Sequence, residues 1–123
     1  CLVGSEMCIR DSTYTLVMFW ASWCHKCEQE IPVLIPVYAK YQNRGFEAIG
    51  VSLDQARSTW VGVIEQRGMQ YPNVSQLQGW DSPIVKDYKI TSTPTYFLLD
   101  SEGKIVLKPK RIYEVDAFLA KNL

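Results

Sequence analysis

FWASWCHKC, residues 19–27, places two cysteines three positions apart directly after a strongly apolar segment. That segment, residues 13–20 (TYTLVMFW), is rich in β-branched and aromatic side chains and is too short for a helix, which predicts a strand buried on both faces. A helical pattern runs from about Cys24 to Gln42, and Pro32 within it predicts a bend. The cysteine pair is therefore expected where a central strand passes into the first turn of a helix.

The rest of the chain alternates between strand and helix patterns. Residues 46–53 (FEAIGVSL) predict a second buried strand, and Asp54 follows at a position typical of a helix N-cap, before a helix that ends near Gly68. The remaining expected elements are a short helix at 81–88, a hairpin with strands at 95–99 and 104–107, and a last helix with Ile112, Val115, Phe118 and Leu119 on one face. This order predicts an α/β fold whose sheet has a parallel portion and an antiparallel edge.

Length and charge limit the class of protein. The chain has 123 residues, of which 47% are hydrophobic, enough for the core of one globular domain. Its 13 basic and 13 acidic residues balance, so there is no excess charge to hold nucleic acid or an anionic lipid surface. No apolar run reaches the roughly 18 residues of a bilayer-spanning helix. We therefore expect no nucleic-acid partner and no membrane span in this sequence. We also expect a monomer.

Residues 1–12 (CLVGSEMCIRDS) have no periodicity and join abruptly to the first strand. They resemble a translated sequencing adapter, so we interpret them as a non-native lead and residues 13–123 as the domain. A natural N-terminal arm is the alternative, because its apolar residues could pack against the domain. If the lead is foreign, Cys1 and Cys8 have no function, and a native signal or membrane anchor is missing with the true N-terminus.

The Cys24-His25-Lys26-Cys27 motif has a spacing suited to reversible disulfide chemistry. Residues three apart on a helical turn face the same side, with Cβ atoms about 5–6 Å apart, close to what a disulfide requires. Cys24 is expected at the helix N-terminus, whose free N–H groups and positive dipole end favour the thiolate, and His25 and Lys26 add positive charge. We therefore expect Cys24 to be the nucleophile and Cys27, deeper in the helix, to resolve the mixed disulfide.

Other uses of such a cysteine pair match the sequence less closely. A zinc site needs more ligands, and residues 13–123 contain no cysteine or histidine beyond this motif. Covalent haem attachment requires histidine after the second cysteine, where Glu28 stands. A static disulfide would close so small a loop that its entropic benefit is slight. Redox chemistry with no metal and no organic cofactor is the favoured interpretation.

Several motifs together resemble the thioredoxin superfamily, and most closely its TlpA/ResA-like branch of extracytoplasmic reductases. The motifs are residues 19–27, Glu30-Ile31-Pro32, Gly79-Trp80-Asp81, Tyr88-Lys89-Ile90, and Thr93-Pro94-Thr95 followed by YFLLD. The resemblance covers about residues 13–123 and implies a thioredoxin fold, a central mixed sheet flanked by helices on both faces. It also implies that the Thr93–Pro94 bond is cis and that both residues form one wall of the substrate site.

Three features depart from the family pattern. Met18 stands where thioredoxin has a buried aspartate, so the acid that assists proton transfer to the second cysteine is missing, and Asp54 or Glu28 are candidate substitutes. His25-Lys26 replaces the common Gly-Pro, and because the intervening pair tunes the redox poise, the direction of electron flow stays open. The family's N-terminal hairpin is also absent from this sequence.

The expected function is a thiol–disulfide oxidoreductase that reduces protein disulfides, with Trp23, His25 and Lys26 tuning the cysteine pair. Its partners would be protein thiols or disulfides and an upstream electron-donor protein. The resemblance implies the cell envelope or periplasm, with the cytoplasm as the alternative. Two other functions stay open on the same fold: a copper or zinc carrier, which needs a further ligand, and a thiol peroxidase, which prefers threonine and proline where this chain has residues 21–23 (ASW).

Overall fold

The computed structural model describes residues 13–69, 71, 73–75, 79–81 and 83–123. Its elements in chain order are β1 (Tyr14–Trp20), α1 (His25–Tyr41), the 3-10 helix η2 (Gln42–Arg44), β2 (Phe46–Ser52), α2 (Arg57–Arg67), β3 (Asn73–Ser75), the 3-10 helix η3 (Gly79–Asp81), α3 (Pro83–Asp87), β4 (Thr95–Leu99), β5 (Ile105–Leu107) and α4 (Ile112–Asn122). The interpretation of residues 1–12 as a foreign lead lies outside the described residues.

The five strands form one sheet in the order β3-β2-β1-β4-β5. Strands β1, β2 and β3 are parallel, whereas β4 is antiparallel to both β1 and β5. β1 is the central strand, and its side chains from Leu16 to Trp20 are all buried. A strand covered on both faces has no solvent side, which explains the continuous apolar run in this part of the sequence.

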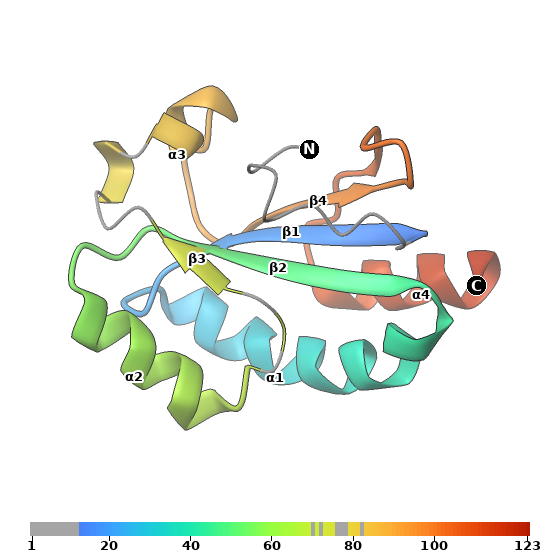
Figure 1. The fold of residues 1–123 in the computed structure, drawn as a ribbon, viewed down its shortest axis with the longest axis horizontal. Helices are drawn as coiled ribbons and strands as arrows, with labels where there is room; N and C mark the ends of the chain where they lie inside the picture. The colour runs from blue at the N-terminus through green and yellow to red at the C-terminus, as the bar shows by residue number, and fades with distance from the viewer. Residues whose placement is uncertain (1–12, 70, 72, 76–78, 82) are drawn as a thin grey trace.

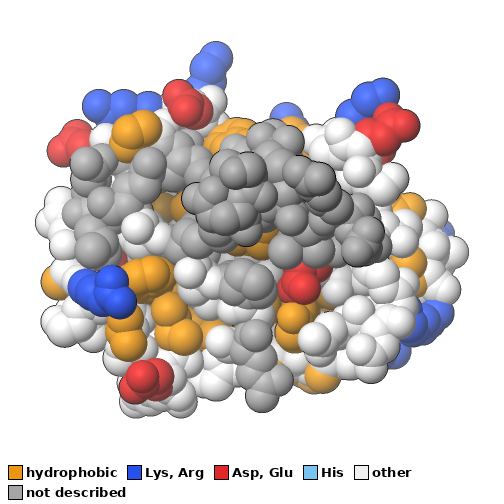
Figure 2. Space-filling model, in the orientation of Figure 1, with side chains coloured by type: hydrophobic (Ala, Val, Ile, Leu, Met, Phe, Trp, Pro, Cys, Tyr) orange, Lys and Arg blue, Asp and Glu red, His pale blue; other side chains and the backbone are white. Residues whose placement is uncertain are grey.

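Helices cover both faces of the sheet (Figure 1). α1, α2 and α4 lie on one face and α3 lies on the other. The predicted architecture, a mixed sheet with helices on both sides, is thereby confirmed. On the face drawn in Figure 2, the described basic and acidic side chains are interspersed rather than gathered by sign, in keeping with the balanced composition.

Three local predictions differ from the structure. Asp54 is not a helix N-cap: α2 begins at Arg57 after an extended Ala56, and the Asp54 side chain is used elsewhere. The third parallel strand, β3, was not predicted, because it has only three residues and no periodicity can be read over so short a segment. The helix expected at residues 81–88 is divided into η3 and the five-residue α3.

The bounds of the long helix α1 are close to the predicted ones. It has 17 residues and continues through both Pro32 and Pro36 to Tyr41. Each proline removes one backbone N–H from the helix, so the carbonyl four residues earlier lacks its helical donor. One of these carbonyls, that of Glu28, lies in the first turn beside the cysteines.

Candidate active site

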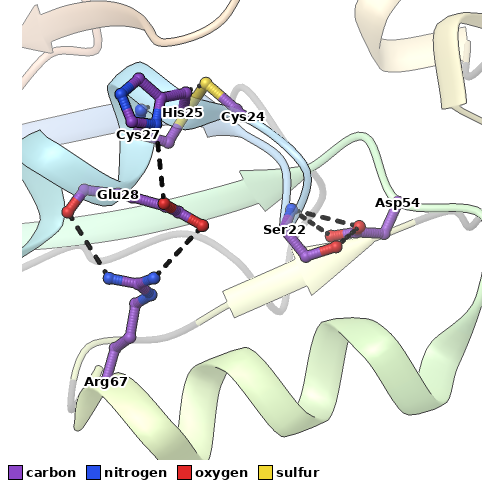
Figure 3. A network of polar contacts seen from close by, with 7 residues as sticks. All are labelled: Ser22, Cys24, His25, Cys27, Glu28, Asp54 and Arg67. Carbon is purple, nitrogen blue, oxygen red and sulfur yellow. Dashed lines mark hydrogen bonds and ion pairs between the residues drawn. A yellow bond between two sulfur atoms is a disulfide. The ribbon is translucent and has the colours of Figure 1, made fainter.

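Cys24 and Cys27 form a disulfide at the start of α1, with their Cα atoms 5.2 Å apart (Figure 3). Cys24 is the N-cap of the helix, and its Sγ accepts a hydrogen bond of 3.1 Å from the backbone N–H of Cys27. Cys24 is 6% exposed, whereas Cys27 is fully buried at 0%. Both cysteines are therefore buried, and the less completely buried one is at the helix N-terminus, where free N–H groups stabilise a thiolate.

Asp54 binds the loop that leads from β1 to Cys24 (Figure 3). Its carboxylate accepts the backbone N–H of Ser22 at 3.2 Å and the hydroxyls of Ser22 and Ser52. The residue is 2% exposed, so these three donors supply what water would supply at the surface. Asp54 therefore fixes the chain two residues before the first cysteine, which is why it does not cap α2.

The first turn of α1 is held from the side by Arg67, the last residue of α2 (Figure 3). Arg67 Nη2 lies 3.4 Å from Glu28 Oε1, and Arg67 Nη1 donates a long hydrogen bond of 3.5 Å to the Glu28 carbonyl, the group that Pro32 leaves without its helical donor. The other carboxylate oxygen of Glu28 lies 3.8 Å from Nδ1 of His25. Glu28 is thus engaged by two cationic or polar neighbours at the surface.

Behind the cysteines the strand side of the core is apolar. Met18 is 1% exposed and pairs with Tyr96 of β4 across the sheet. A buried carboxylate comes instead from α1: Glu30, 6% exposed, accepts the backbone N–H of Ile112 at 2.9 Å and lies 3.5 Å from the Arg111 guanidinium. Burial raises the pKa of the Tyr96 phenol, and the negative charge of Glu30 raises it further. Glu30 therefore joins α1 to the N-terminus of α4.

The residues expected to tune the cysteine pair lie at the surface. Trp23 is 57% exposed, the His25 side chain is 82% exposed, and Lys26 is exposed as well. Each is adjacent in sequence to one of the cysteines. Charges on side chains exposed to this degree interact through solvent, which screens them.

The Thr93–Pro94 segment lies at the same end of the sheet as the cysteines. Its peptide bond is cis, and both residues are half-buried. The register pairs Thr95, the first residue of β4, with Phe19 near the end of β1. Since β1 continues directly into the cysteine loop, the cysteine pair and the Thr93–Pro94 segment lie at the same end of the sheet.

Among residues 13–69, 71, 73–75, 79–81 and 83–123, no three or more His, Cys, Asp or Glu side chains cluster in a way that could hold a metal ion. Within the same residues, the helices are too short or too polar to cross a bilayer.

Two neighbours of the cysteines were not anticipated from the sequence. Arg67 reaches Glu28 from 39 residues away, and Trp80 packs against Trp23 with ring centroids 6.2 Å apart. The one available signal for Arg67 was Pro32, since a proline inside a helix frees a carbonyl for an outside donor. For Trp80 no sequence signal marked the contact.

Comparisons with known proteins agree with this geometry. A family model described as thioredoxin-like matches residues 11–105. The chain is 32% identical over 92 residues to the thiol-disulfide oxidoreductase ResA of Bacillus thuringiensis subsp. konkukian, covering 75% of this chain and 51% of that protein. The chain thus spans about half the length of the curated relatives it matches.

Solved structures extend the likeness over nearly the whole chain. A thiol-disulfide oxidoreductase from Bacteroides fragilis superposes with a TM-score of 0.86 at 30% identity, covering 98% of this chain and 89% of that one. The thioredoxin domain of a thiol-disulfide oxidoreductase from Bacteroides vulgatus gives a TM-score of 0.82 at 31% identity, covering 90% and 79%. With the mixed sheet, the helix-capping cysteine and these matches together, the chain belongs to the thioredoxin-like family.

Proposed function

We propose that this domain is a thiol–disulfide oxidoreductase that reduces disulfides in other proteins. The observation that carries the proposal is the position of Cys24, whose sulfur caps α1 and is bonded to Cys27 one turn further on. Relatives and structural neighbours described as thiol-disulfide oxidoreductases support it.

The reaction uses the two cysteines in sequence. In the reduced protein, the Cys24 thiolate attacks one sulfur of a substrate disulfide, forms a mixed disulfide and releases the first substrate thiolate, which takes up a proton. The Cys27 thiol then loses its proton and attacks the Cys24 sulfur, releasing the second substrate thiol. Two electrons pass to the substrate, which becomes a dithiol, and the Cys24–Cys27 pair becomes the disulfide seen here.

The neighbouring residues are assigned supporting roles. The positive charge of Lys26 favours the Cys24 thiolate, the His25 imidazole adds a polar neighbour, and Trp23 provides an exposed apolar surface beside Cys24. The Thr93 backbone pairs with an extended substrate segment, as an added strand pairs with a sheet edge, while Pro94 leaves that edge without an N–H at the adjoining position.

The partners and compartment follow from the same proposal. A dithiol protein of lower reduction potential returns electrons to the Cys24–Cys27 disulfide, so no metal or organic cofactor takes part in the cycle. The likeness to ResA supports a place in the cell envelope or periplasm, and we propose that the domain acts there as a monomer.

The reduction of insulin by dithiothreitol tests the activity. We compare the parent chain with Cys24→Ser and Cys27→Ser, all in a background where Cys1 and Cys8 are serine, so that other thiols do not contribute. The parent should accelerate insulin precipitation, and each single variant should fall to the rate of dithiothreitol alone. Equal rates for the parent and Cys24→Ser would contradict the proposal.

The reduction potential of the pair sets the direction of electron flow. Equilibration with glutathione or dithiothreitol buffers measures it directly. A value of about −270 mV agrees with a reductase. A value of about −120 mV indicates an oxidant and would reverse the proposed direction of electron flow.

A further inference from the structure

Two large aromatic side chains lie exposed and in contact beside the redox pair. Trp23, the residue before Cys24, is 57% exposed, and Trp80 of η3 is 43% exposed. Their ring centroids are 6.2 Å apart with the planes tilted by 48°. The other large hydrophobic side chains that the structure describes as exposed lie on different elements, Ile105 and Val106 on β5 among them.

The fold holds this pair in place through one loop. Asp54 anchors Ser22, which immediately precedes Trp23. Gln55, the residue after Asp54, packs closely on Gly79, so that a Cβ atom at position 79 would lie 2.9 Å from Gln55 Nε2. Gly79 also has a φ of +57°, a conformation suited to glycine. The loop after β2 thus contacts Ser22, the residue before Trp23, and Gly79, the residue before Trp80.

We infer that Trp23 and Trp80 form the contact surface for a large apolar residue next to the reacting cysteine of a protein substrate. The inference rests on the proposed function and names its substrate class. Trp23 directly precedes Cys24, and its contact with Trp80 enlarges the exposed apolar area beside that residue. Exposed aromatic side chains with a polar N–H are favourable anchors at protein interfaces. A polypeptide supplies an apolar neighbour to its cysteine, whereas a small charged disulfide does not.

The electron and proton balance of the exchange is unchanged by this contact. Cys24 attacks the substrate disulfide and expels a thiolate, and Cys27 completes the transfer, as proposed above. Trp80 acts only on the binding of the segment around the substrate cysteine. Its loss should therefore affect substrates with an apolar neighbour and leave the reactivity of the Cys24 thiolate unaltered.

Two reporter peptides separate these effects. Each is a blocked tetrapeptide whose cysteine is joined to thionitrobenzoate, with phenylalanine before the cysteine in one and serine in the other. Stopped-flow mixing with reduced protein, in the background lacking Cys1 and Cys8, gives the second-order rate constant for release of thionitrobenzoate. The variants are Trp80→Ala and Trp80→Phe, and Tyr113→Ala serves as the matched control, since Tyr113 is also an exposed aromatic residue (62%) but lies on α4.

The parent should react about three- to tenfold faster with the phenylalanine peptide, the range given by one aromatic contact. Trp80→Ala should lower this ratio by at least about half without changing the serine-peptide rate, because only Trp23 then remains of the contact surface. Trp80→Phe should lower it less, and Tyr113→Ala should leave it unchanged. A parent without preference, an undiminished preference in Trp80→Ala, or an equal loss with both peptides would overturn the inference. Failure of the proposed function looks different: the parent would then react with both peptides no faster than Cys24→Ser.

Discussion

Replacing Asp54 with alanine removes the acceptor of three hydrogen bonds in one step. The donors are the backbone N–H of Ser22 and the hydroxyls of Ser22 and Ser52. A serine hydroxyl can rotate toward another acceptor, but the backbone N–H of Ser22 cannot. The Asp54→Ala protein would therefore keep at least one donor without a partner beside the active-site loop.

The expected loss of stability follows from two opposing terms. Each hydrogen bond to a charged acceptor contributes about 1.5–3 kcal/mol, so three of them set an upper bound of roughly 4.5–9 kcal/mol. Removing the carboxylate also removes the cost of keeping a charge out of water, which amounts to several kcal/mol for a group that is 2% exposed. We expect a net decrease in the free energy of unfolding of about 2–4 kcal/mol.

Guanidinium unfolding of the oxidised protein measures this decrease. Asp54→Asn keeps one carbonyl oxygen for the Ser22 N–H and should lose less than half as much. Asp100→Ala is the matched control. Asp100 also accepts two backbone N–H groups, those of Glu102 and Lys104 at 2.9 Å, but it does so in an exposed hairpin loop. This variant should lose about 1 kcal/mol of unfolding free energy. A decrease below about 0.5 kcal/mol for Asp54→Ala, at an unchanged denaturant slope, would refute the anchoring role of Asp54.

Burial raises the pKa of the Tyr71 and Tyr96 phenols above about 10, the value in the unfolded chain. The stability that these phenols contribute is therefore complete below about pH 10 and falls as the pH rises further. An unfolding midpoint that stays constant to about pH 11 would contradict this. In the reduced protein, iodoacetamide at mildly acidic pH should label Cys24 before Cys27, and the opposite order would reverse their roles. With Met18 in place of an acid, the resolving step should accelerate with pH, and a flat profile from about pH 6 to 9 would indicate a substitute base. Deleting residues 1–12 should leave insulin reduction unchanged, whereas a large loss would indicate a native arm.

The fold could be predicted because its main elements have strong local patterns. β1 is apolar throughout, since it is the central strand, and the helical spacing after it is long enough to be unambiguous. The position of Cys24 followed from the same pattern, because a strand that passes directly into a helix leaves its junction residues at the helix N-terminus. These conclusions needed only residues that are neighbours in the chain.

The parts that were missed or misread depend on contacts between distant residues. Asp54 stands after a strand and before a helix, where a cap is common, but its partner Ser22 is 32 residues earlier, and nothing in the sequence indicates that pairing. The same holds for Trp23 and Trp80, which lie on separate elements far apart in the sequence and meet only in the folded structure. Burial of Glu30 depends likewise on α4, whose first N–H lies 82 residues away along the chain.

Mass spectrometry of a trapped mixed disulfide tests most directly whether Cys24 is the nucleophile of a disulfide exchange. A Cys27→Ser variant in the background lacking Cys1 and Cys8 is reduced, mixed with insulin, quenched in acid and digested. The geometry predicts an insulin chain attached to Cys24 in near-stoichiometric amount, and no adduct in the reciprocal Cys24→Ser variant, whose remaining thiol is fully buried. An adduct on Cys27 in that variant, or none on Cys24, would contradict the assignment.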